Sequence, residues 1–224
     1  MNVIELHNLR YRWRGQTSDT LAIADLHVRT GEHLFIRGAS GSGKTTLLNL
    51  LAGILVPASG SLEILGQAVY TLDGSARDRF RADHMGVIFQ QFNLLPYLSV
   101  LENVQLPCYF SSRRKQQVGD LQASAYRLLD HLGLDAGLRH RAVTELSVGQ
   151  QQRVAVARAL IGSPELIIAD EPTSALDTDT RDSFLDLLFR EAEAQGSTII
   201  FVSHDPHIAS HFPRVVDLRE LNQP

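Results

Sequence analysis

The chain has 224 residues, 44% of them apolar and 21% charged, with a formal net charge of −4. These totals are typical of a globular protein with a substantial core, and they exclude a strongly basic chain that binds nucleic acid through its overall charge. A single cysteine, Cys108, excludes an internal disulfide and fits a reducing cytoplasm.

The N-terminal segments predict strands and no targeting sequence. No basic stretch is followed by an apolar run, and no apolar run approaches the ~20 residues of a membrane span, so we expect neither a signal peptide nor a transmembrane helix. Val3–Leu6 and Ser61–Leu65 predict antiparallel strands beside the core. Between them, the apolar run His33–Arg37 leads into a glycine-rich segment. A helix is then predicted over Lys44–Ala52, with Gly53 ending it.

Three further short apolar runs predict buried strands at Met85–Phe89, Leu166–Ala169 and Thr198–Val202. Unbroken apolar runs are what a parallel sheet covered on both faces requires. The last two runs end in polar residues, and α/β folds place their ligands at the carboxyl ends of such strands.

The middle of the chain predicts helices. In Leu121–Leu132 the apolar residues recur along one face of a helix, and Gly133 ends the pattern. A second helix is predicted over about Gln150–Ile161. We therefore interpret residues 1–224 as one domain with a helical subdomain inserted at roughly 91–160.

The segment Gly38–Thr45 matches the phosphate-binding pattern G-x-x-x-x-G-K-[ST] between a predicted strand and a predicted helix. Its glycines let backbone N–H groups surround phosphate oxygens, Lys44 reaches the outer phosphates, and the Thr45 hydroxyl ligates Mg²⁺. The pattern predicts binding of ATP and Mg²⁺. The candidate phosphate-binding residues are Gly38, Ser40, Gly41, Ser42, Gly43, Lys44, Thr45 and Thr46.

Two carboxylates follow the predicted strand at 166–169. Beside a phosphate-binding loop, Asp170 is a candidate Mg²⁺ ligand, and Glu171 is a candidate general base that activates the attacking water. Two acids at a strand end are common by themselves, so this assignment depends on the loop.

The order of motifs resembles that of ATP-binding cassette (ABC) ATPases over essentially the whole chain. Leu146–Gln150, followed by the helical run 151–160, is similar to the family's signature motif and signature helix. Gln90 matches the Q-loop, Ser174–Asp177 the D-loop, and His204 the switch histidine. The resemblance implies an α/β P-loop NTPase (RecA-like) core with an antiparallel β subdomain and an inserted α-helical subdomain.

The resemblance also implies roles for individual residues. Gln90 would ligate Mg²⁺, and His204 would donate a hydrogen bond to the γ-phosphate. Two copies of the chain would enclose two ATP molecules head to tail, each site completed by the other copy's residues. Those residues would be Ser147, Gly149, Gln150 and Asp177.

Two positions leave questions open. Val148 stands where the signature usually has its first glycine. A valine resists φ > 0 and brings a branched side chain near the dimer interface, so the rate and tightness of dimer closure stay open. For the aromatic residue that stacks on adenine, the resemblance favours Trp13, with Tyr11 as second choice.

The function expected from these patterns is an ATP-hydrolysing subunit of an ABC transporter. Its partners would be a second copy and integral membrane subunits, which would hold it at the inner face of the cell membrane, and not nucleic acid. The stretch Phe89–Pro96 is similar to the branch serving lipoprotein release, macrolide efflux and cell division. The alternative is a non-transport ABC ATPase that transmits force or a signal to an envelope or cell-division complex. Other non-transport ABC ATPases act in DNA repair or on ribosomes. The DNA-repair type would need a long coiled coil, and the ribosomal type would need a second cassette; the sequence shows neither pattern.

Overall fold

The computed structural model describes residues 1–39, 41–174 and 178–223, with side chains described outside 175–180. Contacts divide the chain into two compact units: Met1–Arg81 with Thr198–Pro224, and Ala82–Ser197. Both units contain helices and parallel strands, and the first also contains an antiparallel sheet. The predicted α/β class is therefore confirmed.

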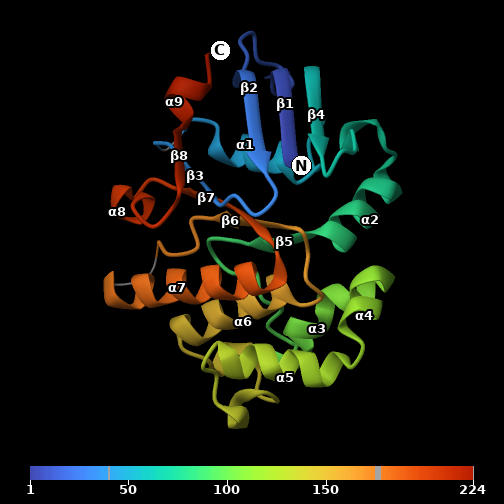
Figure 1. Ribbon diagram of the computed structural model, residues 1–224, viewed down its shortest axis with the longest axis vertical. Helices are drawn as coiled ribbons and strands as arrows, with labels where there is room; N and C mark the ends of the chain where they lie inside the picture. The colour runs from blue at the N-terminus through green and yellow to red at the C-terminus, as the bar shows by residue number, and fades with distance from the viewer. Residues whose placement is uncertain (40, 175–177, 224) are drawn as a thin grey trace. The chain divides into compact units, whose positions relative to one another are not determined.

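The antiparallel sheet of the first unit consists of β1 (Asn2–Tyr11), β2 (Leu21–Arg29) and β4 (Ser59–Ile64). The strands lie in the order β2-β1-β4, so β1 is central (Figure 1). The strands β1 and β4 that the N-terminal patterns predict are confirmed, whereas the edge strand β2 was not predicted. Backbone N–H of Gln223 donates to the carbonyl of Ala22, so the C-terminal segment pairs with the edge strand.

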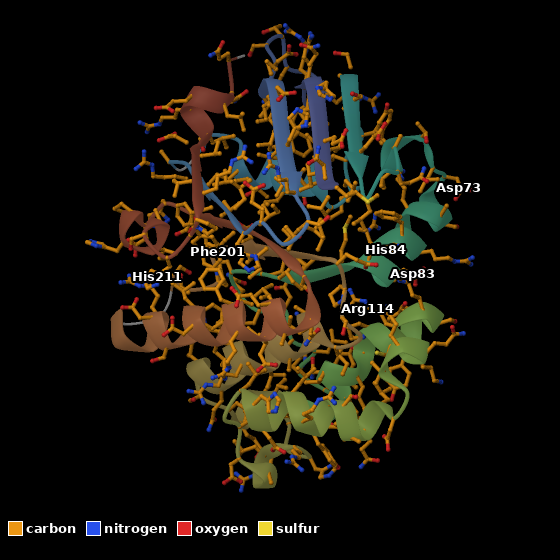
Figure 2. All side chains as sticks on the ribbon, in the orientation of Figure 1. Asp73, Asp83, His84, Arg114, Phe201 and His211 are labelled. Carbon is orange, nitrogen blue, oxygen red and sulfur yellow. The ribbon has the colours of Figure 1, made fainter. Side chains whose placement is uncertain are left out.

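The parallel strands of this unit are β3 (Leu34–Arg37), β7 (Thr198–Ser203) and β8 (Arg214–Asp217), with β3 paired to both of the others. Phe201 of β7, labelled in Figure 2, stacks on Phe35 of β3 at a ring distance of 6.0 Å. The remaining elements of this unit are α1 (Lys44–Leu51), η1 (Val69–Thr71), α8 (Pro206–Ala209) and α9 (Leu218–Leu221).

The second unit begins within the last turn of α2 (Gly74–His84) and has a parallel pair of strands, β5 (Met85–Ile88) and β6 (Leu166–Asp170). Its helices pack on one another: α3 contacts α5 and α6, and α6 contacts α7 (Figure 1). None of the helices in the described ranges combines the length and apolar character needed to cross a bilayer. The helical elements are α3 (Val100–Phe110), α4 (Ser112–Val118), α5 (Leu121–His131), η2 (Ala136–Leu138), η3 (Val143–Glu145), α6 (Val148–Leu160) and α7 (Thr178–Gln195).

A buried arginine anchors α4 within this unit. Arg114 donates hydrogen bonds to the backbone carbonyls of Met85 and Ile161, which lie at the start of β5 and the end of α6. Burial lowers the pKa of Arg114 to about 10, so the side chain remains a cation at neutral pH. Figure 2 shows it near Asp83 and His84, the last residues of α2. The buried charge thus links three elements that are distant in sequence.

Candidate functional site

The phosphate-binding pattern occupies the connection between β3 and α1, as its sequence context predicts. Gly43 is the N-cap of α1 with φ of 95°, and a Cβ there would lie 2.8 Å from a methyl group of Leu21. At Gly38, a Cβ would lie 2.5 Å from the Oγ of Ser42. Only glycine fits both positions without rearrangement. Ser40 lies outside the described residues.

The polar groups of this loop point to an anionic ligand. The Nζ of Lys44 donates to the carbonyls of Gly38 and Ala39, at 2.8 and 3.0 Å, so the ammonium lies over the loop. The Oγ of Ser42 is buried and has no hydrogen-bond partner among the described residues. Because buried polar atoms are normally satisfied, this hydroxyl is available to a ligand such as phosphate. The loop therefore fits a nucleotide.

A cavity of about 530 Å³ opens beside this loop. The segment 15–20 between β1 and β2 forms one side, Gly41 and Ser42 form another, and Asn222 completes the lining. Asp19 holds the segment by accepting from Arg10 at 3.0 Å and from Arg12 at 3.1 Å. The hydrogen bond from Arg10, with the charges of both arginines, lowers the pKa of Asp19 despite the opposing effect of burial.

The two aromatic candidates for adenine stacking differ in exposure. Tyr11 is the last residue of β1 and only 9% exposed, whereas Trp13, two residues later, is 41% exposed. The two rings meet edge to face at 5.2 Å. The buried ring of Tyr11 therefore packs against the ring of Trp13, and Trp13 keeps an exposed ring surface that a base can reach.

His204 leaves the sheet next to the phosphate loop. In the parallel pair of β3 and β7, Arg37 is aligned with Ser203. Gly38 and His204 directly follow these partners, and neighbouring strands lie about 4.8 Å apart. The same edge of the sheet thus carries the start of the loop and the exposed histidine.

Asp170, Glu171 and Gln90 are brought together by the parallel pair in the second unit. Ile88 of β5 is aligned with Ala169 of β6; β5 ends at Ile88, and β6 ends one residue later, at Asp170. Glu171 has φ of 44°, a left-handed conformation that non-glycine residues rarely adopt. Such strain persists where the surrounding structure requires it, often at active sites. Glu171 is partly buried and directly follows β6.

The predicted signature residues form the N-terminus of α6. Ser147 is the N-cap: its Oγ accepts from the backbone N–H of Gln150 at 3.3 Å, and the Gln150 side chain accepts from the backbone N–H of Ser147 at 2.9 Å. Val148 is the first helical residue and does not have positive φ. The expectation that this position needs φ > 0 is therefore wrong, because a helical N-terminus accepts a valine without backbone strain. A Cβ at Gly149 would meet no atom within 4 Å.

Comparison with known proteins decides the family. Residues 21–174 match the ABC transporter family. This chain belongs to that family. It is 41% identical to the ABC transporter ATP-binding protein YbbA of Escherichia coli (strain K12), over 97% of this chain and 94% of YbbA. It is 42% identical to the macrolide export ATP-binding/permease protein MacB 2 of Aeromonas hydrophila, over 94% of this chain but 32% of that longer protein.

A solved structure supports the same assignment. The dimeric ATP-binding cassette MJ0796, in a post-hydrolysis state bound to ADP and Pi, superposes with a TM-score of 0.85 at 35% identity. The alignment covers 96% of this chain and 93% of that one. The chain is accordingly an ATPase of the ABC transporter family, with the P-loop NTPase fold that its motifs predict.

Two residues of the ABC signature helix have contacts that the motifs did not predict. Gln152 is buried and donates from Nε2 to the carbonyl of Pro172 at 2.9 Å, next to Glu171. Arg158 donates to the carbonyls of Phe92 and Asn93, in the segment after Gln90. Burial lowers the pKa of Arg158. Only Arg158 had a sequence signal, as a single charged residue within the apolar run 154–160; Gln152 lies among other polar residues, and nothing marks it.

The site residues therefore fall into two groups, each described within its own unit. The first unit carries Trp13, the phosphate loop and His204; the second carries Gln90, Asp170, Glu171 and the signature residues. In the D-loop, the backbone N–H of Ser174 donates to the carbonyl of Glu171 at 3.2 Å. Asp177 lies outside the described residues.

Proposed function

We propose that this ABC ATPase acts as a head-to-tail homodimer around two MgATP and drives integral membrane subunits of a transporter. The observation that carries the proposal is the phosphate loop, with its buried unpartnered Ser42 Oγ and Lys44 ammonium beside an open cavity. Within one copy, the phosphates would contact Gly38–Thr46 and the base would stack on Trp13.

The reaction would be hydrolysis of the γ-phosphate by water. We propose Thr45, Gln90 and Asp170 as the Mg²⁺ ligands; the ion would neutralise charge on the phosphates. Lys44 would donate to the outer phosphates, and Glu171 would accept the proton of the attacking water. His204 would donate a hydrogen bond to the γ-phosphate. The left-handed backbone of Glu171 supports its role, because it restricts where the carboxylate can point.

The second copy would complete each site with Ser147, Gly149, Gln150 and Asp177. A capped helix N-terminus carries a partial positive charge and N–H groups suited to phosphate. In the dimer, the cap pair of Ser147 and Gln150 would exchange its internal hydrogen bonds for contacts with the γ-phosphate of the other copy. The relation to a dimeric cassette holding ADP and Pi supports this arrangement.

Exposed aromatic side chains support a membrane partner. Tyr97 is 78% exposed and Phe110 is 72% exposed, and Phe89 and Tyr109 are also exposed, all in the second unit. Large apolar side chains in water favour a protein partner. We propose that membrane subunits cover them and hold the ATPase at the inner face of the cell membrane. Residues 91–160 would form the helical subdomain, within a single domain of residues 1–224, that makes this contact.

The test is the variant Glu171→Gln, which keeps the size of the side chain and removes its basic oxygen. Phosphate release should fall by ~10²–10⁴-fold, the usual contribution of a general base. Size-exclusion chromatography with MgATP should show the variant as a dimer and the wild type largely as a monomer, because nucleotide assembles the interface. Normal turnover by a monomeric variant would refute both the catalytic role and the dimer.

Membrane coupling needs a separate measurement. Tag-based copurification of the chain from detergent-solubilised membranes should recover an integral membrane protein in stoichiometric amount. The variant pair Tyr97→Ser and Phe110→Ser should reduce recovery without changing the basal ATPase rate. Recovery of an envelope or cell-division complex without a transport activity would favour force transmission instead of transport.

A further inference from the structure

Four side chains that the nucleotide site does not use gather on the outer face of the antiparallel sheet. In the pair of β1 and β2, Glu5 is aligned with His27, and His7 is aligned with Asp25. Residues two apart share a sheet face, and aligned pairs have Cβ atoms about 4.5–5.5 Å apart. The register therefore places two imidazoles and two carboxylates in one group, with Leu6 and Leu26 buried on the opposite face.

The atoms of this group are close enough to share an ion. One ligand atom from each of Glu5, His7 and His27 lies within 4.8 Å of the other two. The rings of His7 and His27 meet at 4.9 Å. Ligands bound to Zn²⁺ at ~2.0–2.1 Å in a tetrahedron are about 3.4 Å apart. Side-chain rotations that move the ligand atoms by roughly an ångström would therefore bring them to this spacing.

Asp25 contacts one nitrogen of each imidazole. Its two carboxylate oxygens lie 2.8 Å from Nδ1 of His7 and 2.8 Å from Nε2 of His27. A carboxylate favours a proton on the nitrogen it faces, which leaves Nε2 of His7 and Nδ1 of His27 with free lone pairs. Metal-binding histidines are usually oriented by a carboxylate in this way.

Two observations favour binding of a cation by this group. The Nδ1 of His27 is buried and has no hydrogen-bond partner among the described residues. Glu5 is also aligned with Glu63 of β4, and neither carboxylate has an ion-pair partner in the described part of the chain. Like charges directly opposite one another destabilise a sheet. A divalent cation would satisfy the imidazole and offset the repulsion.

We propose that Glu5, His7 and His27 form a binding site for a divalent transition metal ion of the Zn²⁺ class, with Asp25 as the positioning residue. Two imidazoles and one carboxylate are a ligand set that Zn²⁺, Co²⁺ and Ni²⁺ accept, with water in the remaining positions. Asn2 donates to Oε1 of Glu5 at 3.0 Å and leaves Oε2 for the metal. The ion would link β1 to β2, independently of nucleotide.

The experiment uses the full chain with its affinity tag removed and without nucleotide. Isothermal titration with ZnCl₂ should show one site, and Co²⁺ should give the visible absorption of a tetrahedral complex. His7→Ala and His27→Ala should each weaken binding by more than ~100-fold, and Asp25→Asn by ~10–100-fold, the usual effect of losing an orienting carboxylate. Thermal unfolding without metal would confirm that the variants are folded.

The matched control is His140→Ala, which removes an exposed histidine of the second unit. It should bind Zn²⁺ as the wild type does, and all variants should keep the basal ATPase rate. Equal affinity in the wild type and the double variant His7→Ala/His27→Ala would overturn the proposal. Loss of binding in His140→Ala, or the absence of any stoichiometric site in the wild type, would overturn it too.

Discussion

The helix N-termini of α1 and α6 are both suited to phosphate, but they are built differently. The N-cap of α1 is Gly43, which has no side chain and makes no cap hydrogen bond, so its first N–H groups are not satisfied by a side chain. The N-cap of α6 is Ser147, which forms a reciprocal pair with Gln150. Neither helix carries an acidic residue in its first turn, where a carboxylate would repel phosphate.

The two helix ends therefore differ in whether side chains of the same chain cap them: the α1 end has no side-chain cap, and the α6 end has one. Among the described residues, the N–H groups at the α1 end and the buried Ser42 Oγ have no side-chain partners, and on the proposed function a phosphate bound within one chain would supply them. The α6 end is partly satisfied by its own side chains, because the Ser147–Gln150 pair accepts from the N–H groups of both residues. On the proposed function, the first end binds nucleotide first, and the second joins only when two copies meet. Four substitutions test this comparison.

The largest effect is expected at the α1 end. Lys44→Ala removes the ammonium that lies over the loop and leaves the phosphate charge uncompensated. We expect at least a ~100-fold loss of ATPase activity and weaker binding of a fluorescent ATP analogue. Lys115→Ala, at an exposed lysine of α4, is the control and should behave as the wild type. Near-normal hydrolysis by Lys44→Ala would refute the phosphate-loop assignment.

The next effect concerns the α6 end. Ser147→Arg should leave nucleotide binding to the monomer intact, because this end would meet ATP only across the dimer. It should prevent the ATP-dependent dimer, since a bulky cation replaces a hydroxyl at the interface. The measurement is size-exclusion chromatography with MgATP in a Glu171→Gln background.

The matched control for this prediction is Ser99→Arg. Ser99 caps α3 through the same kind of reciprocal pair with Glu102, so both substitutions lose a cap worth roughly 0.5–2 kcal/mol of stability. Only Ser147→Arg should lose the dimer. If Ser147→Arg still dimerised with ATP, the head-to-tail arrangement would be wrong.

A smaller effect is expected inside α6. Gln152→Leu removes the hydrogen bond to the carbonyl of Pro172 and frees the segment after Glu171. We expect kcat to fall by about tenfold with KM nearly unchanged, because Glu171 would be less well oriented. Gln151→Leu, which removes a bond to Leu146, is the neighbouring control. Equal losses in both variants would show a general effect on the helix.

Sequence patterns predicted strand positions best where the whole strand is buried, because a fully buried strand reads as an unbroken apolar run. β6 and β7 are unbroken apolar runs, and both were predicted within one residue of their bounds. β2 was not predicted although Asp25–Arg29 alternates polar and apolar residues; the apolar residues Leu21–Ala24 before it break that alternation. α2 was missed because none of its residues is buried, so no apolar stripe marks it.

The candidate site was predictable in position but not in conformation. Motif spacing predicted that the phosphate-binding pattern follows β3, that Asp170 and Glu171 lie at the end of β6, and that His204 follows β7, which the structure shows; the roles of these residues stay predictions. It could not predict the left-handed backbone of Glu171, since φ depends on the surrounding fold. It also failed at Val148, where the capping pair around it makes the position helical.

The smallest effect is expected for Val148→Gly, and it separates backbone strain from steric hindrance. Val148 is the first residue of α6, without positive φ and with its side chain 51% exposed, so glycine relieves no strain there. A glycine in a helix costs about 0.5–1 kcal/mol relative to alanine, so unfolding should occur at slightly lower temperature. We expect the ATPase rate to change by less than about twofold. A severalfold increase would show instead that the branched side chain obstructs the second copy during closure, and Val148→Ala would then reproduce most of the gain. The pair of variants therefore assigns any effect either to the backbone or to the side chain at the α6 end.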